Sequence, residues 1–267
     1  MGADIKQLRT RIKSVDSTLH LTKAMGLVAS SKIRKATEAM NRGLEYAESL
    51  DEMVSRLIAC EECKKTPFVS RKSGNRIRLV VIAGDRGLAG GYNANVFRLL
   101  ADFPDAEVIP IGKRACERFN TFTISAEHYS YHDAMALAQS LCRDFAEDAF
   151  DRLGVLCTKY HSLMSQEAYV KWLLPLSSDV EARSEGIVFE PDETTVLNAL
   201  IPDYIAGMIL SCVKESFASE VAARRVAMDN AGKNAQEMLD RMGLEYNRAR
   251  QGAITQEITE IVAGSNT

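Results

Sequence analysis

Apolar residues recur at every third or fourth position along the first 60 residues of the chain. This alternation is typical of a coiled-coil seam, in which one stripe of a long helix packs against a partner helix. The pattern continues for about eight heptads and predicts a helix over residues 3–58, which would extend roughly 80 Å. The predicted seam consists of Ile5, Leu8, Ile12, Val15, Leu19, Thr22, Gly26, Ala29, Ile33, Ala36, Met40, Gly43, Ala47, Leu50, Val54 and Leu57.

A second long helix is predicted at the other end of the chain, from Val196 to Val262. Its one proline, Pro202, lies near its start, where a helix best tolerates proline, and Asp192 or Thr194 is suited to cap it. Its apolar residues fall into two registers that are offset by a stutter. The registers are Met228, Ala231, Ala235, Met238 and Met242, and then Ile254, Ile258 and Ile261. Because helices this long need partners, we expect the two terminal helices to pair antiparallel.

The residues between the two helices have the alternating signals of an α/β domain. The expected strands are Ile77–Ala83, Glu107–Ile111, Gly154–Tyr160 and Ala168–Pro175, with weaker ones at Thr121–Ala126 and Ile187–Phe189, and the expected helices are Tyr92–Leu100 and His132–Leu153. The predicted fold class is therefore α/β with a long antiparallel coiled coil and an inserted Rossmann-like domain. We expect residues 1–60 and 194–264 to form a helical shaft and residues 75–190 to form the α/β domain.

A glycine-rich turn, Gly84–Gly91, follows the first predicted strand and precedes a helix, which is the setting of many dinucleotide sites. Its spacing, G-x-x-G-x-x-G-G, is neither the Rossmann fingerprint nor a P-loop. A tight strand-to-helix turn is the favoured interpretation, with nucleotide binding as the alternative. The four histidines are isolated in the sequence, and Cys60 and Cys63 form a lone C-x-x-C without a second pair. We therefore expect no catalytic residue, no cofactor and no metal ion.

Charge is distributed unevenly along the chain, although the net charge is only −3. Residues 1–35 contain eight lysines and arginines against two aspartates, whereas residues 101–200 are acidic. Such polarity suits contacts with different partners at different ends, with a solvated helix face as the alternative. No run of 18 apolar residues and no signal peptide is evident. The expected product is bacterial and cytoplasmic, with reduced cysteines.

Three blocks of the sequence resemble the gamma subunit of F-type ATP synthase. They are Ile12–Val15 leading into Leu21–Lys32, then Asp85–Asn95, and finally Ala222–Ala231 with Tyr246–Gly264. The resemblance covers the whole chain and is diffuse over residues 104–186. The chain departs from the family pattern at Ala89, where a cysteine is common, and at Gly26 and Gly252.

The resemblance implies a non-catalytic central rotor that couples ion-driven rotation of a membrane c ring to conformational change in a catalytic alpha/beta hexamer. It also implies contact with epsilon and a peripheral position on the cytoplasmic side of the cell membrane. The residues implied to contact the hexamer are Met25, Arg224, Arg250, Gln251, Ile254, Thr255, Glu257, Ile258, Ile261 and Val262. Phe189 and Glu190 are implied to lie toward the c ring and epsilon. An enzyme with helical arms and an unrelated coiled-coil scaffold are the competing hypotheses.

Overall fold

The computed structural model describes residues 2–70, 74–177 and 189–265. Two compact units can be distinguished, one made of residues 31–223 and the other of residues 1–30 together with 224–267. Both terminal helices, α1 (Gly2–Ile58) and α5 (Glu193–Ser265), are longer than any other element and contribute to both units. The predicted helices at the two ends are thus confirmed, with α1 starting one residue earlier than expected.

The larger unit is built on a four-stranded sheet with the order β2-β1-β3-β4. The strands are β1 (Ile77–Ile82), β2 (Glu107–Ile111), β3 (Arg152–Tyr160) and β4 (Gln166–Leu174). β1 is parallel to β2 and β3, and β3 pairs antiparallel with β4. This mixed sheet confirms the Rossmann-like layer and the antiparallel pair at its edge.

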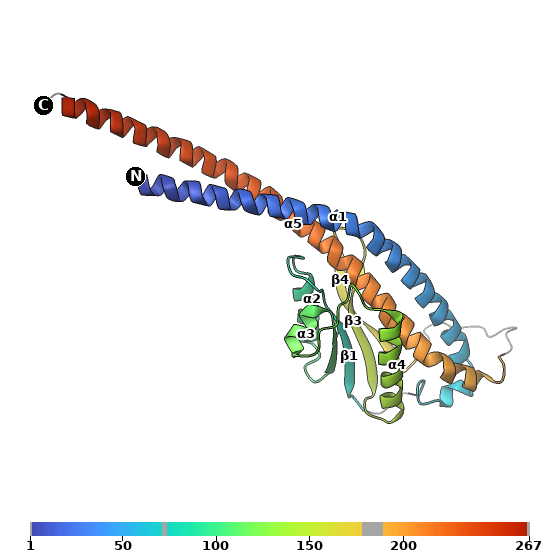
Figure 1. Ribbon diagram of the computed structural model, residues 1–267. Helices are drawn as coiled ribbons and strands as arrows, with labels where there is room; N and C mark the ends of the chain where they lie inside the picture. The colour runs from blue at the N-terminus through green and yellow to red at the C-terminus, as the bar shows by residue number, and fades with distance from the viewer. Residues whose placement is uncertain (1, 71–73, 178–188, 266–267) are drawn as a thin grey trace. The chain divides into compact units, whose positions relative to one another are not determined.

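The sheet is covered on both faces, as the alternation of side chains in β1 requires. Leu79 and Val81 point to one face and pack with α2 (Tyr92–Leu100), while Val80 and Ile82 belong to the main core on the other. That main core is formed by α4 (Tyr131–Ala146), the end of α1 and the first part of α5 (Figure 1). Because β1 is buried on both faces, its sequence reads as a continuous apolar run.

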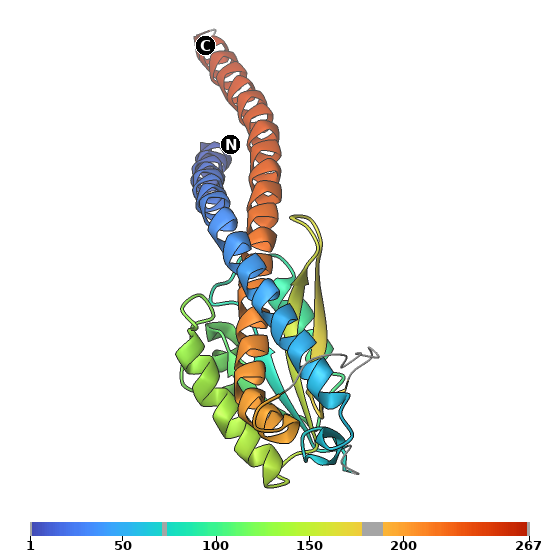
Figure 2. The ribbon, with the colours of Figure 1, turned by 90° about the vertical axis from the view of Figure 1, so that its right-hand side faces the viewer.

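In the larger unit α1 and α5 run antiparallel and in close contact (Figure 2). The Cβ that Gly43 lacks would lie 3.5 Å from Cα of Ser211, and that of Gly207 would lie 2.5 Å from Cδ1 of Leu50. The Tyr204 hydroxyl donates to Asp51 Oδ1 at 3.1 Å. Small residues on the facing sides of the helices therefore permit their close approach.

Among the described residues, α5 is the one helix whose length and composition would allow it to cross a membrane. An 18-residue window in it has a mean hydropathy of 1.7, and 61% of that window is buried inside the protein. Leu197, Ile201, Ile205 and Ile209 are fully buried in the main core. Packing in this core accounts for the hydropathy of the segment.

Two expectations about the α/β domain were wrong, one helix was missed, and one expected strand lies mostly outside the described residues. The helix predicted over His132–Leu153 ends at Ala146, because Asp148 adopts φ 57° and Leu153 pairs with β1 as part of β3. Thr121–Ala126 is not a strand, because hydrogen bonds to Asp85 hold Ser125 and Ala126 in a loop. A short helix, α3 (Lys113–Phe119), was missed. Of the strand predicted at Ile187–Phe189, the first two residues lie outside the described residues, and Phe189 is not in a strand.

The glycine-rich segment Gly84–Gly91 is a turn that packs tightly against its surroundings. The Cβ that Gly84 lacks would lie 2.8 Å from Cδ of Glu220 on α5. Gly84 N donates to Asn93 Oδ1 at 2.9 Å, and Leu88 and Gly90 adopt positive φ. The favoured interpretation of a strand-to-helix turn therefore describes the geometry.

Asp85 in this turn ties three segments of the domain together. Its carboxylate accepts hydrogen bonds from the backbone N–H groups of Lys113, Ala126 and Glu127, each at 3.0 Å, and from Ser125 Oγ at 2.6 Å. Burial alone would raise the pKa of this carboxyl, but the hydrogen bonds outweigh it and lower the pKa. Asp85 thus has a structural role.

Candidate functional site

The smaller unit consists of the N-terminal part of α1 and the C-terminal part of α5, which pair antiparallel. The two chain termini lie at the same end of this pair (Figures 1 and 2). The Cβ that Gly26 lacks would lie 3.7 Å from Cβ of Met228, and that of Gly232 would lie 3.6 Å from Oγ1 of Thr22. Because residue numbers rise on one helix as they fall on the other, the expected antiparallel pairing is confirmed.

The seam predicted for α1 is the buried side of this helix. All sixteen of its residues are buried or half-buried, while the residues between them are mostly exposed. In the larger unit, Ala47, Leu50, Val54 and Leu57 continue the stripe into the main core. The three-four spacing thus marks the face through which α1 packs along its length.

Of the predicted seam residues of α5, Met228, Ala231, Ala235 and Met242 are buried or half-buried, whereas Met238 is not. Met238 is 43% exposed, and its neighbour Leu239 is half-buried instead. Gly232 and Tyr246 also face inward. When they and Leu239 are included, successive inward-facing residues are alternately four and three positions apart as far as Ala253. The buried or half-buried series is Met228, Gly232, Ala235, Leu239, Met242, Tyr246, Ala249 and Ala253.

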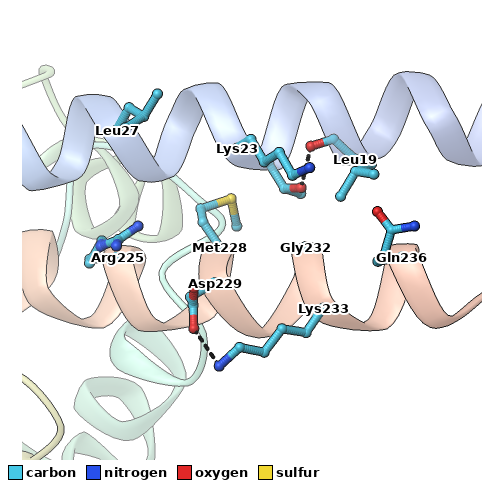
Figure 3. Close-up of a pocket in the computed structure, with 10 residues that line it drawn as sticks. Leu19, Lys23, Leu27, Arg225, Met228, Asp229, Gly232, Lys233 and Gln236 are labelled. Atoms are coloured by element: carbon cyan, nitrogen blue, oxygen red, sulfur yellow. Dashed lines mark hydrogen bonds and ion pairs between the residues drawn. The ribbon is translucent and has the colours of Figure 1, made fainter.

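Where the two helices pair, a groove of about 430 Å³ lies between them (Figure 3). Its floor is apolar, with Leu19 and Met228 buried and the Thr22 hydroxyl donating to the Leu19 carbonyl at 2.9 Å. Charged side chains line its edges, among them Lys23 and Arg225. Asp229 pairs with Lys233 at 2.9 Å, and this hydrogen bond lowers the pKa of Asp229.

At and beside this groove, α1 presents apolar side chains that are largely exposed. Leu21, Leu27 and Val28 are each more than half exposed. Sequence reasoning did not single them out, although their positions between seam residues in an otherwise basic helix were a usable signal. An exposed apolar cluster with basic neighbours is typical of a protein–protein contact surface.

The last turns of α5 extend past the N-terminal end of α1 (Figures 1 and 2). The Cβ that Gly252 lacks would meet no atom within 4 Å, so this position faces open space. Here the apolar residues leave the seam register and are largely exposed. We call this set the tip stripe, and it consists of Ile254, Ile258, Ile261 and Val262.

The site residues predicted from the resemblance fall into two groups on the smaller unit. Met25 and Arg224 are half-buried and lie at the level of the groove. Their chain neighbours, Gly26 and Arg225, face each other: a Cβ at Gly26 would lie 3.0 Å from Nη1 of Arg225. Arg250 and Gln251 are exposed just before the tip stripe, and the Thr255 hydroxyl donates to the Gln251 carbonyl at 2.9 Å. Glu257 lies in the same helix, but its side chain is outside the described residues. About 26 residues, or roughly 39 Å of helix, separate Arg224 from Arg250.

The two predicted residues toward the c ring lie in the larger unit, just before α5. Phe189 packs half-buried against the main core, and Glu190 is exposed. Asp192 then caps α5, as expected, because its carboxylate accepts from Thr195 N at 2.9 Å and from Thr195 Oγ1 at 2.7 Å. These hydrogen bonds, the backbone one first, lower the pKa of Asp192.

The described residues contain no group of three or more His, Cys, Asp or Glu side chains placed to hold a metal ion. Cys60 and Cys63 lie in the turn that follows α1, and all six cysteines are free thiols. The site is therefore a set of helix surfaces, suited to contacts with other proteins.

Comparison with known proteins identifies the family. Residues 4–267 match the sequence family described as ATP synthase. The ATP synthase gamma chain of Ruminococcus albus is 39% identical over 281 residues, which covers 98% of each chain, and that of Moorella thermoacetica is 37% identical with 99% of each covered.

Solved structures show the same fold. A chain in the mitochondrial ATP synthase of Euglena gracilis, determined as OSCP/F1/c-ring, superimposes with a TM-score of 0.70 at 18% identity, and covers 100% of this chain and 95% of its own. A chain in the central stalk/c-ring of the Tetrahymena thermophila enzyme superimposes with a TM-score of 0.61 at 22% identity, with 79% and 99% covered. Because full-length relatives exceed 30% identity, the chain belongs to the ATP synthase gamma-chain family.

Proposed function

We propose that the tip stripe of α5, with Arg250 and Gln251 beside it, is the surface on which this chain turns inside an alpha/beta hexamer. As a gamma chain, the protein is a non-catalytic part of the central stalk, or rotor, of F-type ATP synthase. The observation that carries the proposal is that the end of α5 extends past α1 with its apolar side chains exposed. An exposed apolar surface of this kind needs a partner that shields it from water.

The contacts at the tip are suited to rotation. Apolar contacts are not directional, so a ring lined with apolar side chains can hold the tip stripe in several orientations at similar free energy. Hydrogen bonds donated by Arg250, Gln251 or Thr255, or accepted by Glu257, are directional and would favour particular orientations. Together the two kinds of contact would bias identical catalytic subunits into different states, which is coupling through differential contacts.

Contacts near the groove would add a second level of interaction with the hexamer. Met25 and Arg224 lie there, beside exposed Leu27 and Val28. This surface combines apolar side chains with basic ones such as Lys23, which suits an acidic, apolar partner segment. The groove level and the tip lie on one helix pair, so both would turn together.

The α/β domain within the larger unit would form the foot of the rotor. The chain is a component of a membrane-associated ATP synthase, and we propose that Phe189 and Glu190 face its c ring and epsilon subunit. The chain would then be peripheral to the cell membrane on the cytoplasmic side. In this scheme residues 1–60 and 194–264 form the shaft, and residues 75–190 form the foot.

Reconstitution with alpha and beta subunits tests the proposal. Adding the full chain to a mixture of alpha and beta should stimulate ATP hydrolysis at one copy per hexamer. Gln251→Leu should lower turnover, and Gln139→Leu, which changes an exposed glutamine on α4, should not. If the chain does not stimulate hydrolysis, or Gln251→Leu keeps the wild-type rate, the assigned role of the tip is wrong.

A further inference from the structure

A second groove lies within the larger unit, away from every residue assigned above. It runs between α1 and α5 and ends against the first residue of α4, with a volume of about 520 Å³. This volume is within the range of roughly 300–1,000 Å³ that is typical of small-molecule sites. The rotor function leaves this groove unexplained.

One end of the groove is cationic. Arg42 on α1 and Lys214 on α5 both line it. A Cβ at Gly43, the residue after Arg42, would lie 3.9 Å from Cβ of Lys214, so the two basic residues come from adjacent positions on the facing helices. Lys214 Nζ donates to the Tyr129 carbonyl at 2.8 Å. Neither Arg42 nor Lys214 forms an ion pair with another residue in the described ranges. Burial lowers the pKa of Lys214, and an anion beside it would offset that penalty.

A serine hydroxyl lies next to the cationic end. Ser211 is only 4% exposed, lines the groove, and its hydroxyl makes no hydrogen bond to any residue that the structure describes. A Cβ at Gly43 would lie 3.8 Å from this oxygen, so the missing side chain leaves space in front of it. Since it has no partner within the described residues, this hydroxyl is available to donate a hydrogen bond to a ligand acceptor in the groove.

The opposite end of the groove is aromatic. Tyr46 and Tyr131 both line it and are partly exposed. The Tyr131 hydroxyl donates to Asp203 at 2.5 Å, so this end already contains a carboxylate and disfavours a second anion. A Cβ at Gly207 would lie 3.0 Å from Cε1 of Tyr46, which shows how closely the backbone of α5 approaches this ring.

We propose that this groove binds a phosphate monoester of a molecule that also contains a planar ring. The phosphate lies between Arg42, Lys214 and Ser211, because two cations and one hydroxyl donor match its negative oxygens. The ring lies against Tyr46 and Tyr131, whose faces offer stacking contacts. The proposal concerns a ligand of the chain itself and does not depend on the contacts with the hexamer.

Titration calorimetry of the isolated full chain tests the site with four probes: phenyl phosphate, AMP, adenosine and inorganic phosphate. We expect phenyl phosphate and AMP to bind with Kd below about 1 mM, and adenosine and inorganic phosphate to bind at least about tenfold more weakly, because each lacks one half of the ligand. Arg42→Met and Lys214→Met should each weaken phenyl phosphate binding about tenfold or more. The matched control is Lys159→Met, an exposed lysine on β3.

Lys214 also supports Tyr129, so Lys214→Met must keep the wild-type circular dichroism spectrum and melting temperature to count. Arg42 is exposed and makes no such contact, so its variant tests the site even if Lys214→Met unfolds. The absence of binding to either phosphate ester would overturn the proposal. So would equal affinities of wild type and Arg42→Met, or equal affinities for inorganic phosphate and phenyl phosphate.

Discussion

Replacing Ile254, Ile258 and Ile261 together by serine should weaken binding to the alpha/beta hexamer without unfolding the chain. These residues are 43%, 56% and 71% exposed, and together they expose the equivalent of about 1.7 isoleucine residues. Burying one isoleucine fully is worth about 1.5–3 kcal/mol, so a ring that covers the stripe would gain about 2–5 kcal/mol from these three residues.

We expect a loss in the lower half of this range, about 2–3 kcal/mol, because association also restricts the end of the helix. That loss corresponds to a dissociation constant raised about 30- to 150-fold. The free energy of unfolding should change by less than about 0.5 kcal/mol, since these side chains are exposed and isoleucine and serine have similar helix propensities.

The assay is equilibrium binding of the labelled full chain to a preformed alpha/beta hexamer, with urea unfolding measured in parallel. The control is the triple replacement by valine, which keeps a branched apolar side chain at each position and should bind within about tenfold of wild type. Wild-type affinity of the serine variant would show that the stripe is not buried in the hexamer. A large fall in its folding stability would show instead that the stripe packs within the chain.

Three further changes test the structural reasoning. Asp85→Asn should cost about 1–3 kcal/mol of stability at pH 7 in urea unfolding, because four hydrogen bonds lose their charged acceptor. Folding lowers the pKa of Asp85, so its charge stabilises the fold fully above the unfolded pKa of about 3.9. The difference in unfolding free energy between the wild type and Asp85→Asn should therefore shrink as the pH falls through the folded pKa. A difference that does not depend on pH would contradict this. Gly112→Ala should prevent folding or reduce soluble yield sharply, because φ is 93° and the new Cβ would lie 1.9 Å from the Ala83 carbonyl oxygen. Gly243→Ala should raise stability by up to about 1 kcal/mol, because it meets nothing within 4 Å in mid-helix; destabilisation would mean that this stretch of α5 is not a regular helix.

The long-range organisation of the chain could be predicted because its strongest signals are repeated many times. The seam of α1 has sixteen positions, so single irregular members such as Thr22 and Gly26 did not obscure the period. The bounds of β2 and α2 were predicted as observed, because both depend on local signals. For β2 the signal is an apolar run delimited by proline and glycine, and for α2 it is a short helical repeat.

The wrong expectations share a physical cause, which is that tertiary contacts override local pattern. Leu153 continues the helical spacing of α4, but pairing with β1 buries it completely in β3. The strand predicted at Thr121–Ala126 has suitable β-branched residues, but no neighbouring strand offers a full ladder, and Phe122 is 94% exposed. α3 has only seven residues, too few for a helical period to be recognised.

Sequence reasoning alone does not identify the site residues, because contact surfaces lack the fixed spacing of catalytic motifs. Arg250 and Gln251 are exposed residues of an ordinary helix, and only the resemblance to gamma subunits distinguished them. Ser211 and Lys214 were missed altogether, since their proximity to Arg42 arises from the packing of two helices that are far apart in sequence.

The stutter near the end of α5 acquires a physical explanation from where α1 begins. As far as Ala253 the inward residues follow the regular four-three spacing that a partner helix requires, and among them Gly232 and Ala249 are small. Beyond that point α1 no longer lies alongside, so nothing in the described chain fixes which face must be apolar. The isoleucines nevertheless continue, at Ile254, Ile258 and Ile261, on a neighbouring face. Exposed isoleucines in a helix without a partner lower solubility unless another molecule covers them. Under the proposed function, the change of register would therefore mark the point where the partner of α5 changes from α1 to the hexamer.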